Sequence, residues 1–339
     1  MLVRIGSFDT DTRPFLIAEI GNNHEGDPGQ AFELVAAALE AGVDAVKVQI
    51  IDPPRLVNIA QTERIAQLTR FVLPLDVFAR MAEQTRKGGA CFMASAFDDD
   101  SLSRIAPLCD AIKIASGDLT FDPLLAAAAA AGKPMVLSTG MARIEEIDHA
   151  VSLIGRHLHT GQQLETMLAL LHCVSLYPTG LTQANLSTMH TLRDRFGLTT
   201  GYSDHTLGIE AALVALGMGA RILEKHFTLD KAKSTFRDHA LSADPLEMRR
   251  LAKVVRNFPA LGGDGQKGEA IADAGMAPAV RRSAVLARDL PAGAKVTDAD
   301  IDFVRPGGGI APGAVKGIVG RKLKAAQPRH TVLSPEHFD

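Results

Sequence analysis

Two short motifs near the middle of the chain each carry one histidine at the end of an apolar run. They are residues 202–206 (YSDHT) and 224–226 (EKH), and a Gly-, Ala- and Leu-rich segment of helical character separates them. This spacing predicts that His205 and His226 lie at the ends of neighbouring strands. Two neutral imidazoles so placed suit Mn, Fe, Co or Zn, with carboxylates and water completing the shell. The alternative is that His205 caps the following helix and His226 packs under a loop.

Lysines and hydroxyls follow other apolar runs. Lys113 and Ser116 come with one run, and residues 138–140 (STG) end the next. An ammonium group, hydroxyls and loop N–H groups that converge at successive strand ends could hold a phosphate. The competing interpretation is that Lys113 pairs with a buried carboxylate in an internal ion network.

Carboxylates are frequent at the same strand ends and could donate or accept protons there, although each could also be structural. Cys173 and His172 are residue types that can act as nucleophile and base, but neighbouring residues of a strand point to opposite faces of the sheet. We therefore expect Cys173 to be a packing residue. The candidate carboxylates are Glu19, Asp118, Glu224 and Asp238.

These residues need a scaffold that brings strand ends together, and the pattern of apolar runs supplies one. The runs are continuously apolar, as in parallel strands covered on both faces. Helical patterns occupy 28–41, 74–87, 123–131, 144–157 and 208–217. Strand-then-helix units in this number predict a (β/α)8 TIM barrel, with an open doubly wound sheet as the weaker alternative. The eight expected strands are 15–21, 45–50, 91–96, 111–116, 134–139, 167–173, 198–203 and 221–227.

A second, smaller unit follows the barrel. A Gly-rich stretch begins near residue 261, and short β-rich runs broken by Pro and Gly begin near Arg281. We expect a catalytic barrel at 1–262, a linker at 263–280 and a small β-rich domain at 281–339. Its expected strands are 283–288, 295–296, 301–304 and 322–324.

Composition excludes several classes of function. The 339 residues carry a net charge of −3 without a basic stripe, which disfavours nucleic acid as a partner. The longest apolar runs are too short to span a bilayer and no signal-like segment opens the chain, so we expect a cytoplasmic protein without a membrane partner. The three cysteines lack a Cys-x-x-Cys pair and are expected to be reduced.

The motifs together resemble the sialic acid synthase family, whose members condense phosphoenolpyruvate with an amino sugar. The resemblance covers nearly the whole chain, and the C-terminal unit is similar to the antifreeze-like (SAF) domain of that family. The segments that carry it are 17–26 (IAEIGNNHEG), 45–49 (AVKVQ), 112–117 (IKIASG), 137–141 (LSTGM), 171–173 (LHC), 177–179 (YPT), 202–208 (YSDHTLG) and 223–230 (LEKHFTLD).

The resemblance implies roles for individual residues. It makes His205 and His226 the ligands of a divalent ion, most simply Mn²⁺, with Mg²⁺ or Co²⁺ as alternatives. It implies that Arg305 reaches the sugar bound by the other subunit of a domain-swapped homodimer. Lys47, Lys113, Ser116 and Ser138 would bind phosphoenolpyruvate. Glu19, Gln49, Tyr177 and Asp238 would surround the sugar and the reacting atoms, and Glu224 would lie near the metal. Ser175 would also bind substrate, and the catalytic candidates are Glu19, Lys47, Asp118, Glu224 and Asp238.

The function implied is an N-acetylneuraminate synthase that condenses phosphoenolpyruvate with N-acetylmannosamine and releases phosphate. The alternative is a legionaminic or pseudaminic acid synthase that uses a diacetamido-trideoxyhexose. A metal-dependent sugar aldolase or isomerase and a non-catalytic carbohydrate binder are further alternatives. The chain departs from the family pattern at Asp118, at Ser175, in residues 50–54 (IIDPP) and in residues 234–238, which leaves the sugar open.

Overall fold

Eight parallel strands close into a barrel, as the sequence pattern predicts. They follow one another around the ring in chain order, and the last strand pairs with the first. The computed structural model describes residues 2–233, 236–266 and 275–339. The barrel strands are β3 (Phe15–Gly21), β4 (Ala45–Ile50), β5 (Cys91–Ala96), β6 (Ala111–Ile114), β7 (Met135–Ser138), β8 (Leu168–Cys173), β9 (Thr199–Asp204) and β10 (Ile222–His226).

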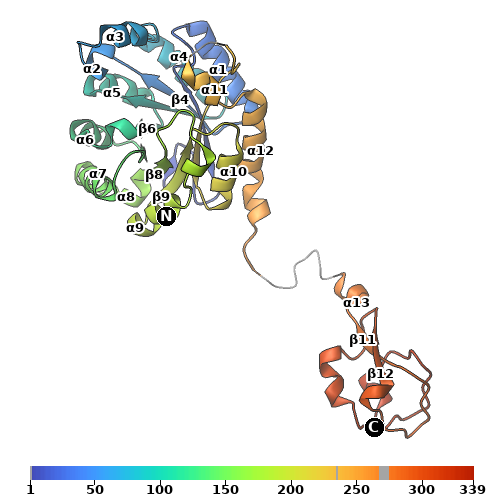
Figure 1. Cartoon of the computed structure of the whole chain (residues 1–339). Helices are drawn as coiled ribbons and strands as arrows, with labels where there is room; N and C mark the ends of the chain where they lie inside the picture. Colours follow the sequence, from blue (N-terminus) through green and yellow to red (C-terminus); the bar gives the residue numbers. More distant parts are fainter. Residues whose placement is uncertain (1, 234–235, 267–274) are drawn as a thin grey trace. The chain divides into compact units, whose positions relative to one another are not determined.

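Helices follow the strands and cover the outside of the barrel (Figure 1). The first of them begins after Asp27, whose carboxylate accepts the N–H of Gly29 at 2.7 Å, and ends at Gly42 in the left-handed conformation (φ 87°). Such caps each stabilise a helix by about 1 kcal/mol. The outer helices are α1 (Pro28–Ala41), α4 (Leu75–Lys87), α5 (Asp99–Ile105), α6 (Asp122–Ala130), α7 (Ile144–His157), α9 (Thr188–Phe196), α10 (Glu210–Gly217) and α12 (Pro245–Gly262).

Alternation along the strands divides the barrel interior into an apolar floor and a polar mouth. Side chains near the strand starts, such as Phe15, Ile17 and Ala45, form a buried cluster that the N-terminal hairpin of β1 (Arg4–Ile5) and β2 (Phe8–Asp9) joins. Two residues further along each strand the inward positions become polar, as at Glu19 and Lys47. The sheet register therefore brings the polar strand ends together at one end of the barrel.

Gly201 is required by close packing inside this wall. A Cβ atom at this position would lie 2.1 Å from the carbonyl oxygen of Ile222 and 2.7 Å from Leu171. Any side chain would force β9 away from β10, which carries His226. The glycine thus lets the two histidine-bearing strands approach each other.

The sequence pattern did not predict the short helices between β4 and α4. These are α2 (Pro53–Leu56) and α3 (Thr62–Thr69), which pack through Leu68 and the neighbouring Phe71. Other short helices are α8 (Leu164–Met167) and α11 (Arg237–Leu241), with 3₁₀ turns at Ala106–Leu108, Ser116–Asp118 and Leu181–Gln183.

The second compact unit runs from Gly263 to Asp339, and the barrel unit runs from Met1 to Gly262. The second unit contains α13 (Ala277–Val280) and an antiparallel pair of strands, β11 (Ser283–Leu286) and β12 (Ile301–Val304). It also has 3₁₀ turns at Asp298–Asp300, Pro312–Gly317 and Pro335–His337. Isolated bridges replace the strands expected at 295–296 and 322–324. Its own apolar cluster includes Leu286, Leu323 and Phe338. No helix among the described residues is long and apolar enough to cross a membrane.

Candidate active site

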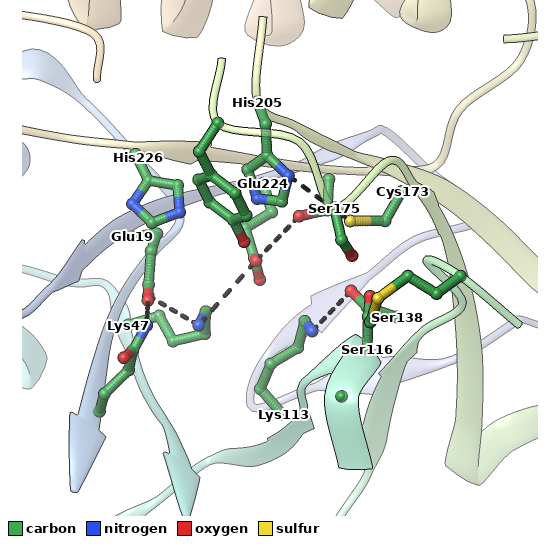
Figure 2. Close-up of a pocket in the computed structure, with 15 residues that line it drawn as sticks. Glu19, Lys47, Lys113, Ser116, Ser138, Cys173, Ser175, His205, Glu224 and His226 are labelled. Atoms are coloured by element: carbon green, nitrogen blue, oxygen red, sulfur yellow. Dashed lines mark hydrogen bonds and ion pairs between the residues drawn. The ribbon is translucent and has the colours of Figure 1, made fainter. Parts of the chain in front are cut away.

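A cavity of about 220 Å³ lies at the polar mouth of the barrel (Figure 2). Most of the residues singled out from the sequence line it, which follows from their shared position at the strand ends. The residues around this first cavity are Glu19, Lys47, Gln49, Lys113, Ser116, Gly117, Ser138, Met141, Cys173, Ser175, Tyr177, Ser203, His205, Glu224 and His226.

Lys47 links two carboxylates on one side of the first cavity. Its Nζ lies 2.7 Å from Glu19 Oε2 and 3.9 Å from Glu224 Oε1, and all three side chains are buried. Glu19 Oε1 also accepts the amide N–H of Gln49 at 2.7 Å. Burial raises the pKa of Glu19, although the Lys47 ammonium opposes the shift. Burial lowers the pKa of Lys47, but Glu19 and Glu224 outweigh it and the net shift is upward.

Lys113 occupies the other side and has different partners. Its Nζ donates to Ser138 Oγ at 2.6 Å (Figure 2) and to the carbonyl of Ile114 at 2.8 Å. Among the described residues, no carboxylate lies within ion-pair distance of Lys113, which argues against the structural ion-pair interpretation. Burial lowers its pKa, with Glu224 opposing the shift. A bound anion beside Lys113 would therefore stabilise the charged ammonium.

Hydroxyls and a backbone N–H lie beside the Lys113–Ser138 pair. Ser116 Oγ accepts the N–H of Gly140 at 3.0 Å. A Cβ atom on Gly140 would lie 2.5 Å from Ser175 Oγ and 2.8 Å from Ser116 Oγ, so only glycine leaves these groups accessible. One ammonium and three hydroxyls thus line a space suited to a phosphate.

The two histidines lie side by side at the ends of the paired strands β9 and β10. Their ring centroids lie 5.4 Å apart, and the ring of Tyr177 packs 4.1 Å from that of His205. His205 Nδ1 lies 2.8 Å from the carbonyl oxygen of Val174 and donates its proton there. This bond fixes the tautomer in which Nε2 is the free acceptor, as is usual for metal-ligating histidines. Burial lowers the pKa of His205, but its contact with Cys173 outweighs burial and raises the pKa overall.

The side chains at this mouth could hold a divalent ion only together with ligands from water or substrate. His205 and His226 would hold a divalent ion between them, and the bound ion would supply Lewis-acid chemistry at this mouth. Glu224 Oε2 is buried and has no hydrogen-bond partner among the described residues, which adds an acceptor beside the pair. In the described part of the chain, however, no group of three or more His, Cys, Asp or Glu forms a complete metal-binding set. Water or substrate would have to supply the remaining positions.

Cys173 lines the first cavity, although the sequence predicted only a packing residue. Its Sγ lies 3.7 Å from His205 Nδ1. His172 points to the opposite face, where it stacks on Tyr202 and bonds the carbonyl of Ala184 at 2.7 Å. The split between the two neighbours follows the predicted alternation. The sequence did not reveal that Cys173 faces the cavity, because this depends on the strand register. Cys173 pairs with Ser203, which also faces inward.

A second cavity of about 220 Å³ adjoins the first and shares Gln49, Tyr177 and His226 with it. Asp238 lines this second cavity and not the first. The other residues around it are Asn22, Ile51, Leu56, Arg64, Leu68, Phe97 and Phe236.

Two predicted site residues lie elsewhere. Asp118 lines neither cavity, and burial raises its pKa to about 6, with Lys113 opposing the shift. Arg305 belongs to the C-terminal unit, where it is exposed directly after β12. The unusual segment at 234–238 lies partly outside the described residues.

A closed (β/α)8 barrel with a cavity of polar and charged side chains at the strand ends has the architecture of an enzyme. The match to known families is more specific, since residues 34–267 match the NeuB family and residues 281–339 match the SAF domain. The chain therefore belongs to the NeuB family. It is a transferase of the nonulosonate synthase type with a C-terminal SAF domain.

Relatives cover almost the full length of the chain. It is 38% identical to the N,N'-diacetyllegionaminic acid synthase of Legionella pneumophila over 96% of this chain and 94% of that protein. It is 29% identical to a pseudaminic acid synthase of Campylobacter jejuni over 94% and 95%. The solved N-acetylneuraminic acid (sialic acid) synthetase of Leptospira borgpetersenii, in complex with citrate, aligns with a TM-score of 0.74 at 30% identity, over 81% of this chain and 95% of that one.

Proposed function

We propose that this enzyme condenses phosphoenolpyruvate with a diacetamido-trideoxyhexose to give a legionaminic-type nonulosonic acid and phosphate. The similarity to the Legionella enzyme supports this acceptor over N-acetylmannosamine, which was the first expectation from the sequence. Pseudaminic acid synthesis has weaker support, because the corresponding identity is 29%.

The observation that carries the proposal is that the Lys113–Ser138 pair and the His205–His226 pair line one cavity. Phosphoenolpyruvate has two anionic groups, and Lys113 with Ser116 and Ser138 would hold one of them. Lys47 would contribute its positive charge on the opposite side. The two substrates would then meet between the lysines and the histidines.

The reaction forms one carbon–carbon bond and one carbon–oxygen bond to water, and it breaks the carbon–oxygen bond to phosphate. C3 of phosphoenolpyruvate attacks the aldehyde carbon of the open-chain sugar, water adds at C2, and phosphate leaves with its bridging oxygen. His205 and His226 would hold a divalent ion, most simply Mn²⁺, and the bound ion would supply Lewis-acid polarisation of the aldehyde. Glu19 and Glu224, both within reach of Lys47, would accept and return the proton lost by water.

The test is a panel of acceptors assayed for phosphate release with Mn²⁺ and phosphoenolpyruvate. We expect turnover with the diacetamido-trideoxyhexose at a higher kcat/KM than with N-acetylmannosamine. A higher kcat/KM for N-acetylmannosamine would restore the N-acetylneuraminate synthase assignment. No metal-dependent phosphate release with any N-acetylated sugar would overturn the synthase function and leave the aldolase and binding-protein alternatives.

We also propose that Arg305 completes the sugar site of a second subunit in a domain-swapped homodimer. Its exposure on the small unit and its match to the family arginine support the proposal. The test mixes two inactive variants, Lys113→Ala and Arg305→Ala, after subunit exchange. Action in trans predicts recovered activity, because one barrel of the mixed dimer then has both groups. Action within one subunit predicts none.

A further inference from the structure

Most side chains around the second cavity have no role in the proposed reaction. It adjoins the reacting centre through Gln49, Tyr177 and His226, so a sugar whose aldehyde lies at the histidines extends its far end into it. This step rests on the proposed function. The groups around the second cavity then contact the part of the acceptor that distinguishes one amino sugar from another.

One wall of the second cavity is apolar. It is formed by Ile51, Leu56 and Leu68 from the segment between β4 and α4, together with Phe97 and Phe236. These side chains belong to a small hydrophobic cluster that includes Phe71, whose ring lies 4.9 Å from that of Phe236. A hydroxyl pressed against this wall would lose its hydrogen bonds to water without replacement. A methyl group in the same place would gain by burial.

Two residues of this wall come from the chain directly after β4. Ile51 follows the last residue of β4, and Leu56 is the last residue of α2. The side chain of Ile51 is 6% exposed, so the surrounding packing holds it in position.

Asn22 also lines the second cavity. Glu19 Oε1 accepts from Gln49 Nε2 at 2.7 Å, and Gln49 Oε1 in turn accepts from Asn22 Nδ2 at 3.2 Å. This chain fixes the orientation of the Asn22 amide and directs Oδ1 away from Gln49. Oδ1 is buried and has no hydrogen-bond partner among the described residues, and Asn22 is 7% exposed. A buried carbonyl of this kind is completed by an N–H donor, which an acetamido group supplies.

From these contacts we infer that the second cavity selects the acceptor by its far end. Leu56 and the apolar wall accept the methyl group of a deoxy position, and Asn22 accepts the N–H of a second acetamido group. Leu56 and Asn22 are the specificity-determining residues in this inference. The acceptor class is a sugar that carries a methyl and an acetamido group where N-acetylmannosamine carries hydroxyls.

The first experiment compares N-acetylmannosamine with its 6-deoxy derivative, which differ by one hydroxyl. Phosphate release by the full chain with Mn²⁺ and saturating phosphoenolpyruvate should give a kcat/KM about tenfold higher for the deoxy sugar. Leu56→Asn, which is nearly isosteric, should reduce this ratio to about twofold or less and leave the KM for phosphoenolpyruvate unchanged. The matched control is Ile59→Asn on the same segment, because Ile59 is 80% exposed and lines neither cavity.

The second experiment adds the diacetamido-trideoxyhexose and the variant Asn22→Leu. This variant should lower kcat/KM for the diacetamido sugar by about tenfold more than for the 6-deoxy monoacetamido sugar. Equal losses for all acceptors in both variants would overturn the specificity assignment while turnover upholds the synthase function. If no sugar releases phosphate, calorimetry measures the affinity of the wild type and both variants for the same sugars. Equal affinities in the wild type and the variants would overturn the inference.

Discussion

Lys225 Nζ lies 3.0 Å from Asp204 Oδ2, and each of these residues directly precedes one of the paired histidines. Lys225 also donates to the carbonyl of Thr206 at 2.5 Å, and Asp204 Oδ1 accepts the N–H of Thr206 at 2.8 Å. The pair is buried on the face of the sheet opposite to His205 and His226. It therefore ties β9 to β10 at the level of the histidines.

Breaking this ion pair should destabilise the barrel. Lys225→Met leaves the Asp204 carboxylate buried without its cation and should lower the free energy of unfolding by about 3–5 kcal/mol. The double variant Asp204→Asn with Lys225→Met removes both charges and should recover part of that loss. Denaturant unfolding measures both. Lys231→Met, which breaks the more exposed contact between Lys231 and Glu247, is the control and should cost about 1 kcal/mol or less. Equal losses in the single and double variants would contradict the prediction.

The histidine pair should control metal affinity directly. His205→Asn and His226→Asn are each expected to weaken Mn²⁺ binding by at least about 100-fold. Removing a residue that only hydrogen-bonds to a metal ligand already weakens metal binding by about 10–100-fold, and removing the ligand itself should cost at least as much. Calorimetry and the electron paramagnetic resonance signal of bound Mn²⁺ report binding without turnover. His149→Asn is the matched control, since His149 is an exposed residue of α7 that pairs with Asp122. Unchanged affinity in either site variant would exclude that residue as a ligand.

Much of this arrangement could be predicted from the sequence, for a physical reason. In a parallel barrel the strands are continuously apolar and their polar ends must converge, so the pattern of runs alone places Lys113 and His226 at one mouth. Cys173 and the second cavity could not be predicted in this way. Cys173 faces the site only because of the register with Ser203. The second cavity depends on how Leu56 and its neighbours pack. Helices α2 and α3 have only 4 and 8 residues, too few for a periodic pattern to predict that packing.

Loss of the Lys113 ammonium should reduce kcat/KM for phosphoenolpyruvate but leave the stability of the fold nearly unchanged. Its contacts are Ser138 Oγ and a backbone carbonyl, so Lys113→Met keeps the apolar stem and leaves no unpaired carboxylate behind. We expect kcat/KM for phosphoenolpyruvate to fall by about 10²–10³-fold while the melting temperature changes little. Lys87→Met provides the control, because Lys87 is an exposed residue at the end of α4. A loss of less than about threefold would remove Lys113 from the phosphate site.

The stability of the barrel should decrease in acid through His24. This side chain is fully buried in the loop after β3, where Nδ1 accepts the N–H of Gly26 at 3.0 Å. Burial lowers its pKa to about 4, with Asp27 and Glu25 opposing the shift. Below about pH 6.5 the unfolded chain binds a proton that the folded chain does not bind, so folding loses free energy as the pH falls. The contribution is absent at neutral pH and reaches about 3 kcal/mol at pH 4.

The variant His24→Asn isolates this effect. An asparagine oxygen can accept the N–H two residues further on, as Nδ1 does, but it does not titrate in this range. Wild type and variant should therefore differ in the pH dependence of unfolding between about pH 6.5 and 4, where the variant loses about 3 kcal/mol less. Urea unfolding at several pH values measures this slope. Parallel pH profiles for the two proteins would show that His24 is protonated as readily in the folded chain as in the unfolded one.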